Sequence, residues 1–186
     1  MASIAAESHL AEFDVVSNMA VSDELRTRFE VSWANDDLDG VTRLLQGQGC
    51  IIGLSDAGAH VSQMCDAVLP TDFLANWVRD RQVMSLEQGV RKLTGELGEV
   101  LCIDRGHIAV GAPADLLVID LAELDPGPMR RVRDMPADGE RVIADQPRGY
   151  RHIVVNGVPT VSDGKSVVET LDTLPGVVVR SVKDLK

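Results

Sequence analysis

The sequence is poor in the residue types that several classes of binding site require. Only 3% of its 186 residues are aromatic, which leaves little material for the stacking platforms that bind single-stranded nucleic acid. Its 18 lysines and arginines are outnumbered by 29 aspartates and glutamates, so the formal net charge is −11. A field of that sign repels nucleic acid and anionic lipid surfaces. We therefore expect no nucleic acid and no membrane among the partners.

Long apolar runs and closely spaced cysteines are lacking as well. No stretch reaches the roughly 18 apolar residues needed to span a bilayer, and the first residues lack the basic and apolar regions of a signal peptide. The cysteines, Cys50, Cys65 and Cys102, form no CxxC pair, which argues against a disulfide framework or a zinc knuckle. We expect a cytoplasmic protein whose thiols are reduced and mostly buried.

What the sequence does contain is 45% apolar residues, enough for a folded core, arranged first in a helical pattern. Asp36 or Asp37 can cap a helix that stops at Gly47. Residues 71–82 place apolar side chains at helical spacing, and Ser85 with Gln88 has the form of a capping box that starts a third helix. Before these helices, residues 13–17 are compatible with a strand, although their periodicity is weak.

After about Cys102 the pattern changes to short apolar runs separated by turn residues, which is typical of strands. Asn156-Gly157 predicts a hairpin between residues 150–156 and 158–161, and Asp163-Gly164 predicts a second turn. Between these regions, residues 124–149 form a polar stretch in which arginines alternate with acidic residues. We interpret this stretch as a solvated connection rather than an anion site. The chain therefore divides near residue 100, into residues 1–100 and 101–186.

The most informative segment is residues 50–60, which read CIIGLSDAGAH. Its apolar start predicts a buried parallel strand, with Cys50 as a small apolar filler. Asp56 would then lie at the carboxyl end of the strand, where (β/α)8 barrels carry their catalytic residues. The alternative is that Ser55 and Asp56 simply cap a turn or the following helix. Gly58 would supply a positive φ or let a substrate approach the backbone.

Three blocks carry a resemblance to a known family: residues 53–60, residues 104–108 with Gly111 and 114–116, and residues 152–157. Together they resemble the metal-dependent amidohydrolase superfamily, and within it the N-acyl-D-amino-acid deacylase (D-aminoacylase-like) branch. The similarity runs from about residue 26 to about residue 165 and matches only the C-terminal part of such an enzyme. It implies an α/β fold in which the last units of a TIM-like barrel, a partial (β/α) barrel segment over residues 1–100, precede a β-sandwich portion over residues 101–186.

The resemblance also implies a site. Asp56 matches the aspartate at the end of the last barrel strand, and its implied role is general acid/base catalysis on a small-molecule amide such as an N-acyl amino acid. His60, Ser55 and Gly58 match the surrounding segment and are implied substrate-binding residues, although a loop histidine bonded to backbone is an equally good interpretation of His60. Zinc is the expected metal, with Asp56 as a ligand only if another chain completes the site.

The chain lacks much of what such an enzyme needs. It has no His-x-His pair, and of its histidines at positions 9, 60, 107 and 152 only His60 is near a predicted strand end. We interpret His107 and His152 as partly exposed strand residues, and leave the role of Cys65 open. A full barrel takes about 250 residues, so we expect either a homo-oligomer or a complementing N-terminal barrel polypeptide, with the chain inactive alone. The alternatives are a truncated, non-catalytic, self-associating module and a small-molecule binding domain around Asp56 and His60.

Overall fold

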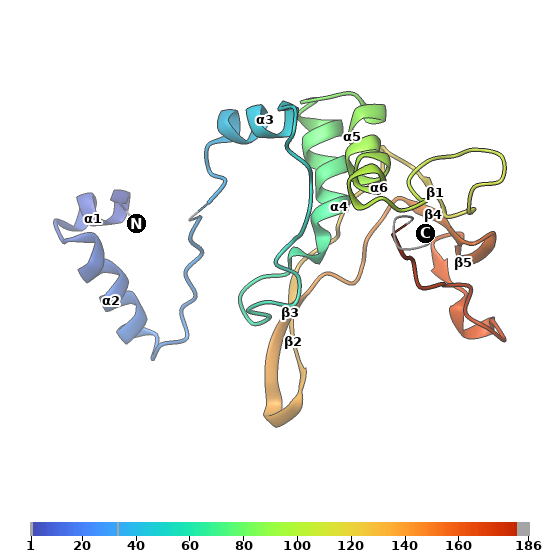
Figure 1. Ribbon diagram of the computed structural model, residues 1–186. Helices are drawn as coiled ribbons and strands as arrows, with labels where there is room; N and C mark the ends of the chain where they lie inside the picture. Colours follow the sequence, from blue (N-terminus) through green and yellow to red (C-terminus); the bar gives the residue numbers. More distant parts are fainter. Residues whose placement is uncertain (1, 33, 182–186) are drawn as a thin grey trace. The chain divides into compact units, whose positions relative to one another are not determined.

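The computed structural model describes residues 2–32 and 34–181, and the chain forms two compact units, Met1–Val41 and Thr42–Lys186 (Figure 1). In the first unit, α1 (Ala2–Ser8) and α2 (Glu12–Ser22) pack on each other and bury Ala5 and Val15. The predicted strand at residues 13–17 is therefore wrong. The acidic first turn of α2 suits a helix N-terminus, and burial of Val15 fixes the helical face.

Helix α3 (Leu38–Gln46) confirms the predicted helix before Gly47. The carboxylate of Asp37 accepts a hydrogen bond from the backbone N–H of Gly40 at 3.0 Å, which satisfies one of the free donors at the helix start. A local capping signal was therefore sufficient to locate this element.

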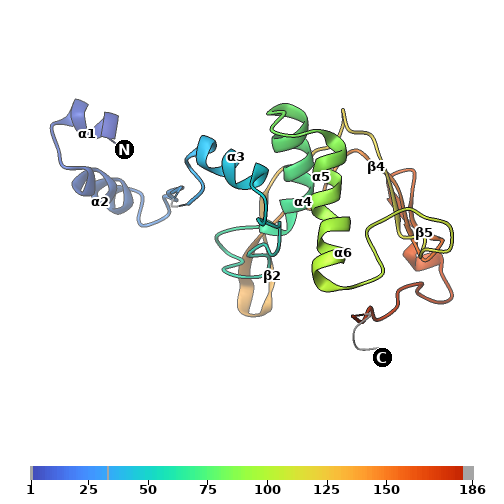
Figure 2. The same ribbon diagram turned by 45° about the horizontal axis from the view of Figure 1, so that its top comes forward.

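The second unit contains a group of helices that pack side by side (Figure 2). They are η1 (Asp66–Val68), α4 (Leu69–Asp72), the π-helix η2 (Phe73–Asp80), α5 (Leu86–Leu93) and α6 (Gly95–Leu101). The predicted helix at 71–82 is confirmed, although most of it is π-helical. The capping box is confirmed too, because the Ser85 hydroxyl accepts from Gln88 N while the Gln88 side chain accepts from Ser85 N. Gly89 lets α5 approach η2 closely, since a Cβ there would lie 2.7 Å from Val78.

The strands of the main sheet are antiparallel and follow the order β1-β4-β5-β6. They comprise β1 (Leu116–Ile119), β4 (Tyr150–Val155), β5 (Val158–Ser162) and β6 (Lys165–Ser166), followed by the short η4 (Val168–Thr170). Asn156 and Gly157 turn between β4 and β5 with φ of 47° and 81°. Both predicted turns are confirmed, because Asp163 and Gly164 also adopt positive φ.

A separate hairpin of β2 (Arg130–Met135) and β3 (Gly139–Ile143), joined by η3 (Pro136–Asp138), projects from the second unit (Figure 1). The stretch predicted as a polar, solvated connection over residues 124–149 therefore contains a hairpin that was not predicted. The charged side chains of this stretch form ion pairs across and around the hairpin. The nitrogen–oxygen distances are 2.5 Å for Arg130–Asp145, 2.7 Å for Arg141–Asp134, 3.0 Å for Arg133–Asp138 and 3.2 Å for Arg131–Glu140.

The core of the second unit joins the helices to the main sheet. Phe73, Leu74, Ala75 and Val78 pack around Leu124, whose side chain is fully buried. Arg79 reinforces this junction, since its Nη1 donates to the Leu124 carbonyl at 2.6 Å and to the Leu121 carbonyl at 3.0 Å. The turn before the β2–β3 hairpin is therefore fixed by a helix side chain.

The predicted barrel strand at residues 50–54 is wrong for this structure. Residues 51–56 have no regular secondary structure, and the Leu54 side chain is 94% exposed. Within the described ranges, no hydrogen bond joins the backbone of residues 51–54 to another segment. A parallel strand takes its hydrogen bonds from neighbouring strands, and none of the described strands lies beside this segment.

At the level of fold class, the chain is a mixed α/β structure, as expected. The α-helices end at Leu101, and the strands with two short 3-10 helices follow it, but the division near residue 100, the barrel and the sandwich stay predictions. Among residues 2–32 and 34–181, no helix combines the length and the apolar character needed to cross a bilayer.

Candidate functional site

The candidate catalytic carboxylate, Asp56, lies in an exposed loop of residues 55–64. The Ser55 hydroxyl accepts from the Ala57 backbone N–H at 3.3 Å, and the Asp56 carbonyl accepts from Ala59 N–H at 3.0 Å. Gly58 closes this turn with φ of 85°, and no atom lies within 4 Å of a Cβ placed there. The expected turn-forming parts of Ser55 and Gly58 are therefore present, while their roles toward a substrate stay predictions.

His60 begins the second half of the loop. Its φ is 46°, and its carbonyl accepts the backbone N–H groups of Gln63 and Met64 at 2.7 and 3.2 Å. The imidazole is exposed and takes part in no hydrogen bond or ion pair with the described residues. The structure thus uses the backbone of His60 to shape the loop and leaves its ring accessible. Whether that ring contacts a substrate stays a prediction.

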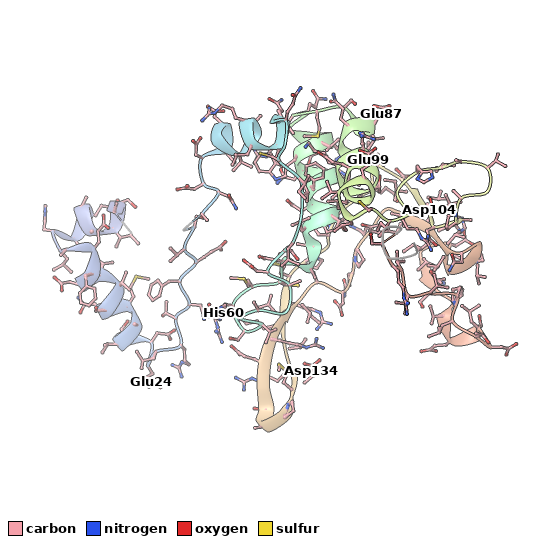
Figure 3. The ribbon with its side chains drawn as sticks, viewed as in Figure 1. Glu24, His60, Glu87, Glu99, Asp104 and Asp134 are labelled. Carbon is pink, nitrogen blue, oxygen red and sulfur yellow. The ribbon has the colours of Figure 1, made fainter. Side chains whose placement is uncertain are left out.

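The β2–β3 hairpin forms hydrogen bonds with this loop. Val142 N–H donates to the Val61 carbonyl at 2.7 Å, and Arg131 Nη1 donates to the Ser62 carbonyl. Figure 3 labels His60 on the loop and Asp134 on the hairpin beside it. This contact could not be predicted from the sequence, because the hairpin region resembles a polar connection and the two bonded residues are 69 positions apart.

A cavity of about 550 Å³ lies between the loop and the hairpin. Gly58, Cys65 and Asp66 line it on the loop side, with Arg130 and Arg141 among the residues on the hairpin side. Each of these arginines is bonded to an aspartate: hydrogen bonds from Arg130 and Arg141 lower the pKa of Asp145 and Asp134, respectively. The positive and negative charges on the hairpin side of the cavity therefore neutralise each other. Ser55, Asp56 and His60 are not among the residues that line the cavity.

The described residues do not by themselves fit a metal centre. Within the described ranges, no three His, Cys, Asp or Glu side chains are grouped so that they could hold an ion. Cys50 is exposed rather than buried, because the strand expected to cover it is absent, whereas all three cysteines are free as expected. His107 and His152 are partly exposed as expected, with side-chain exposures of 52% and 40%. His107, however, lies outside the strands.

The other two sequence blocks meet at Asp115. One of its carboxylate oxygens lies 2.6 Å from Arg105 Nε, and the other accepts the Asn156 backbone N–H at 2.7 Å. Gly157 N–H adds a bond to the Ala114 carbonyl at 2.9 Å. Gly106 fits against α6, since a Cβ there would lie 2.5 Å from the Thr94 carbonyl carbon. These residues hold the sheet and the helices together rather than forming part of the loop with Asp56.

Comparisons with known proteins identify relatives of this chain. The amidohydrolase family model matches residues 15–168. An uncharacterised protein of Mycobacterium tuberculosis (strain ATCC 25618 / H37Rv) is 32% identical over 128 residues, covering 66% of this chain and 21% of the relative. An N-acyl-D-glutamate deacylase of Alcaligenes xylosoxydans xylosoxydans is 31% identical over 126 residues, covering 65% of this chain and 23% of the deacylase.

Among solved structures, a D-aminoacylase mutant in complex with CuCl2 is similar to this chain with a TM-score of 0.53 and 25% sequence identity. The similarity covers 89% of this chain and 32% of the D-aminoacylase. A second D-aminoacylase structure is 24% identical with a TM-score of 0.45, and covers 60% of this chain. The chain thus spans between a fifth and a quarter of the length of the curated relatives it matches.

Proposed function

Because the chain belongs to the amidohydrolase family, as a D-aminoacylase-like portion of it, we propose that it supplies the C-terminal part of a metal-dependent amidohydrolase. The reaction is hydrolysis of the C–N amide bond of an N-acyl amino acid or a similar small amide. The observation that carries the proposal is the family match over residues 15–168, which includes the exposed loop with Asp56. Similarity to an N-acyl-D-glutamate deacylase supports the substrate class.

Asp56 is the proposed general acid/base. Within the described part of the chain, its carboxylate makes no ion pair or hydrogen bond, so both oxygens are available to a reactant. The carboxylate takes a proton from water as the water oxygen bonds to the amide carbon. It then gives that proton to the amide nitrogen as the C–N bond breaks, which releases a carboxylic acid and an amine. Ser55 and Gly58 shape the turn around the reaction, and His60 contacts the substrate.

A metal centre needs ligands beyond those that this chain brings together. The proton transfers proposed for Asp56 therefore use only its own carboxylate. In the proposal a zinc centre includes Asp56 only when another polypeptide supplies the remaining ligands. The isolated chain is then expected to be inactive.

The proposed partner is a polypeptide carrying the N-terminal barrel units, or a second copy of the chain. Support comes from the exposed apolar side chains of Leu54, Ile108 and Val110 and from the unpaired backbone of residues 51–54. An apolar segment with unpaired N–H and C=O groups favours pairing with another strand. The alternative, a non-catalytic module that only self-associates, is favoured by the missing ligands among the described residues.

Co-expression with the N-terminal barrel part of an N-acyl-D-amino-acid deacylase tests the proposal. We expect the complex to bind zinc, by elemental analysis, and to hydrolyse an N-acyl-D-amino acid. Asp56→Asn should then reduce kcat by orders of magnitude with an unchanged circular dichroism spectrum, while His60→Ala mainly raises KM. Asp172→Asn, at an exposed position in the last part of the chain, serves as the matched control. A metal-free, inactive, self-associated chain would instead support the non-catalytic module.

A further inference from the structure

The β2–β3 hairpin contacts two consecutive carbonyls of the loop that carries Asp56. Arg131 and Val142 are direct partners across the hairpin. Val142 uses its backbone N–H to bond the Val61 carbonyl at 2.7 Å, and Arg131 uses its side chain to bond the Ser62 carbonyl. One cross-strand pair of the hairpin therefore binds the carbonyls of two consecutive peptide units of the loop.

These two bonds are important because the other hydrogen bonds of the loop are internal to it. Among residues 2–32 and 34–181, no other hydrogen bond or ion pair joins residues 55–64 to a different element. The internal bonds of the loop, from Ala59 to Asp56 and from Gln63 and Met64 to His60, define its turns. They do not fix where those turns lie relative to the rest of the unit.

The side chain of Arg131 is itself held in place. Its Nη1 lies 3.2 Å from Glu140 Oε1 on the facing strand, and both side chains are only partly exposed. A guanidinium presents several donors in a rigid plane, so one group can serve a carbonyl and a carboxylate together. A charged donor also makes a stronger hydrogen bond than a neutral one.

From this arrangement we propose that Arg131 is a positioning residue that fixes the loop of Asp56 and His60 through the Ser62 carbonyl. The inference rests on the proposed function for its catalytic meaning, because a general base must be placed within hydrogen-bond reach of the proton it takes. The β2–β3 hairpin takes no direct part in the proposed reaction. Its proposed role is to orient the loop that carries Asp56.

Amide hydrogen exchange of the isolated chain, followed by NMR, tests the inference without any catalysis. Arg131→Ala should speed exchange of the Gln63, Met64 and Val142 amides by at least about fivefold, since loss of a bond to a charged donor frees the loop. The ring resonances of His60 should shift as well. Arg131→Lys, which keeps a charged donor, should restore most of the protection.

Arg133→Ala is the matched control. Arg133 lies on the same strand, also pairs with Glu140 at 3.7 Å, and has its hydrogen bonds with Asp138 rather than with residues 55–64. We expect it to leave the loop amides and the His60 resonances unchanged. Amides of β4 and β5 should exchange at wild-type rates in every variant, which shows that the fold is intact.

Equal effects of Arg131→Ala and Arg133→Ala on the loop amides would overturn the inference, as would no effect of either. Failure of the proposed function would appear differently, as absence of hydrolysis by the wild-type complex. In an active complex, Arg131→Ala should lower kcat several-fold, and Arg131→Lys should recover part of it. A change confined to KM would also contradict the positioning role.

Discussion

The hydroxyl groups of Thr71 and Tyr150 lie 2.7 Å apart, although 79 positions separate them in the sequence. Thr71 is buried in α4, and Tyr150 is the first residue of β4. This bond links the helical group to the main sheet next to the Leu124 core. It is the only polar side-chain pair of the described residues that joins α4 to the sheet.

Removal of this bond should weaken the second unit. Tyr150→Phe leaves the buried Thr71 hydroxyl without its partner, and we expect the free energy of unfolding to fall by about 1 kcal/mol. Thr173→Val, at an exposed position, should stay within about 0.5 kcal/mol of wild type. Urea denaturation followed by circular dichroism measures both. A loss in Tyr150→Phe no larger than that of the control would contradict the bridging role.

Arg79 provides a second link between the helices and the turn at 121–124. Arg79→Met keeps much of the side-chain volume but removes the donor to the Leu121 and Leu124 carbonyls. We expect a clear fall in melting temperature, because these carbonyls lose a charged donor. Arg91→Met removes an exposed arginine paired with Glu99 and should have a several-fold smaller effect. Similar melting temperatures for the two variants would disprove the link.

Two glycines with similar positive φ angles should respond differently to substitution. Gly149 has φ of 84° and Gly157 has φ of 81°. A Cβ on Gly149 would lie 2.6 Å from Leu124 Cα, whereas a Cβ on Gly157 would meet no atom within 4 Å. Gly157→Ala should therefore cost only backbone strain, about 1 kcal/mol, and Gly149→Ala at least about 2 kcal/mol more. Thermal unfolding compares the two, and equal losses would show that the backbone at Leu124 can move away.

Asp72 should make stability depend on pH in a specific direction. Partial burial raises the pKa of its carboxyl above the ordinary value of 3.8, despite a hydrogen bond from Asn76. The unfolded chain therefore ionises first as pH rises above 3.8, and the ionised folded form carries a penalty at neutral pH. That penalty is absent below the unfolded pKa, where both states are protonated.

Asp72→Asn removes this penalty while preserving the shape of the side chain. We expect it to raise the free energy of unfolding at pH 7 by less than about 1 kcal/mol, because the site is partly solvated. The gain should shrink as pH falls toward 3.8 and vanish below it. Denaturation at several pH values measures the difference from wild type. A gain that persisted at low pH would indicate a cause other than ionisation.

The parts of the fold that could be predicted from sequence depend on local signals. Asp37 before α3, the capping box at Ser85 and the Asn156-Gly157 turn each act over a few residues, so their structure follows from their own sequence. Whether residues 50–54 form a strand could not be predicted from local signals, because a strand needs a second strand to which it is hydrogen bonded. The β2–β3 hairpin was missed because β2 has no buried apolar face: Val132 is only partly buried, and the other five residues of the strand are exposed.

In the candidate site, too, local features could be predicted from the sequence and long-range contacts could not. The turn formed by Ser55, Asp56 and Gly58 follows from residues adjacent in sequence. The bond from Arg131 to Ser62 joins segments 69 positions apart, and arginines in a charged stretch give no indication of which carbonyl they will meet. Sequence thus located the candidate carboxylate but not the element that holds its loop.

The apolar side chains that the second unit exposes have a consequence for how copies of the protein meet. Each copy carries a formal charge of −11, and at low ionic strength this repulsion extends far beyond contact distance. Dissolved salt shortens the range of this repulsion to about 8 Å at physiological concentration but does not screen burial of apolar side chains such as the exposed Leu54 and Ile108. If the proposed self-association occurs, we therefore expect added salt to strengthen it, because salt weakens the charge repulsion more than the apolar contacts.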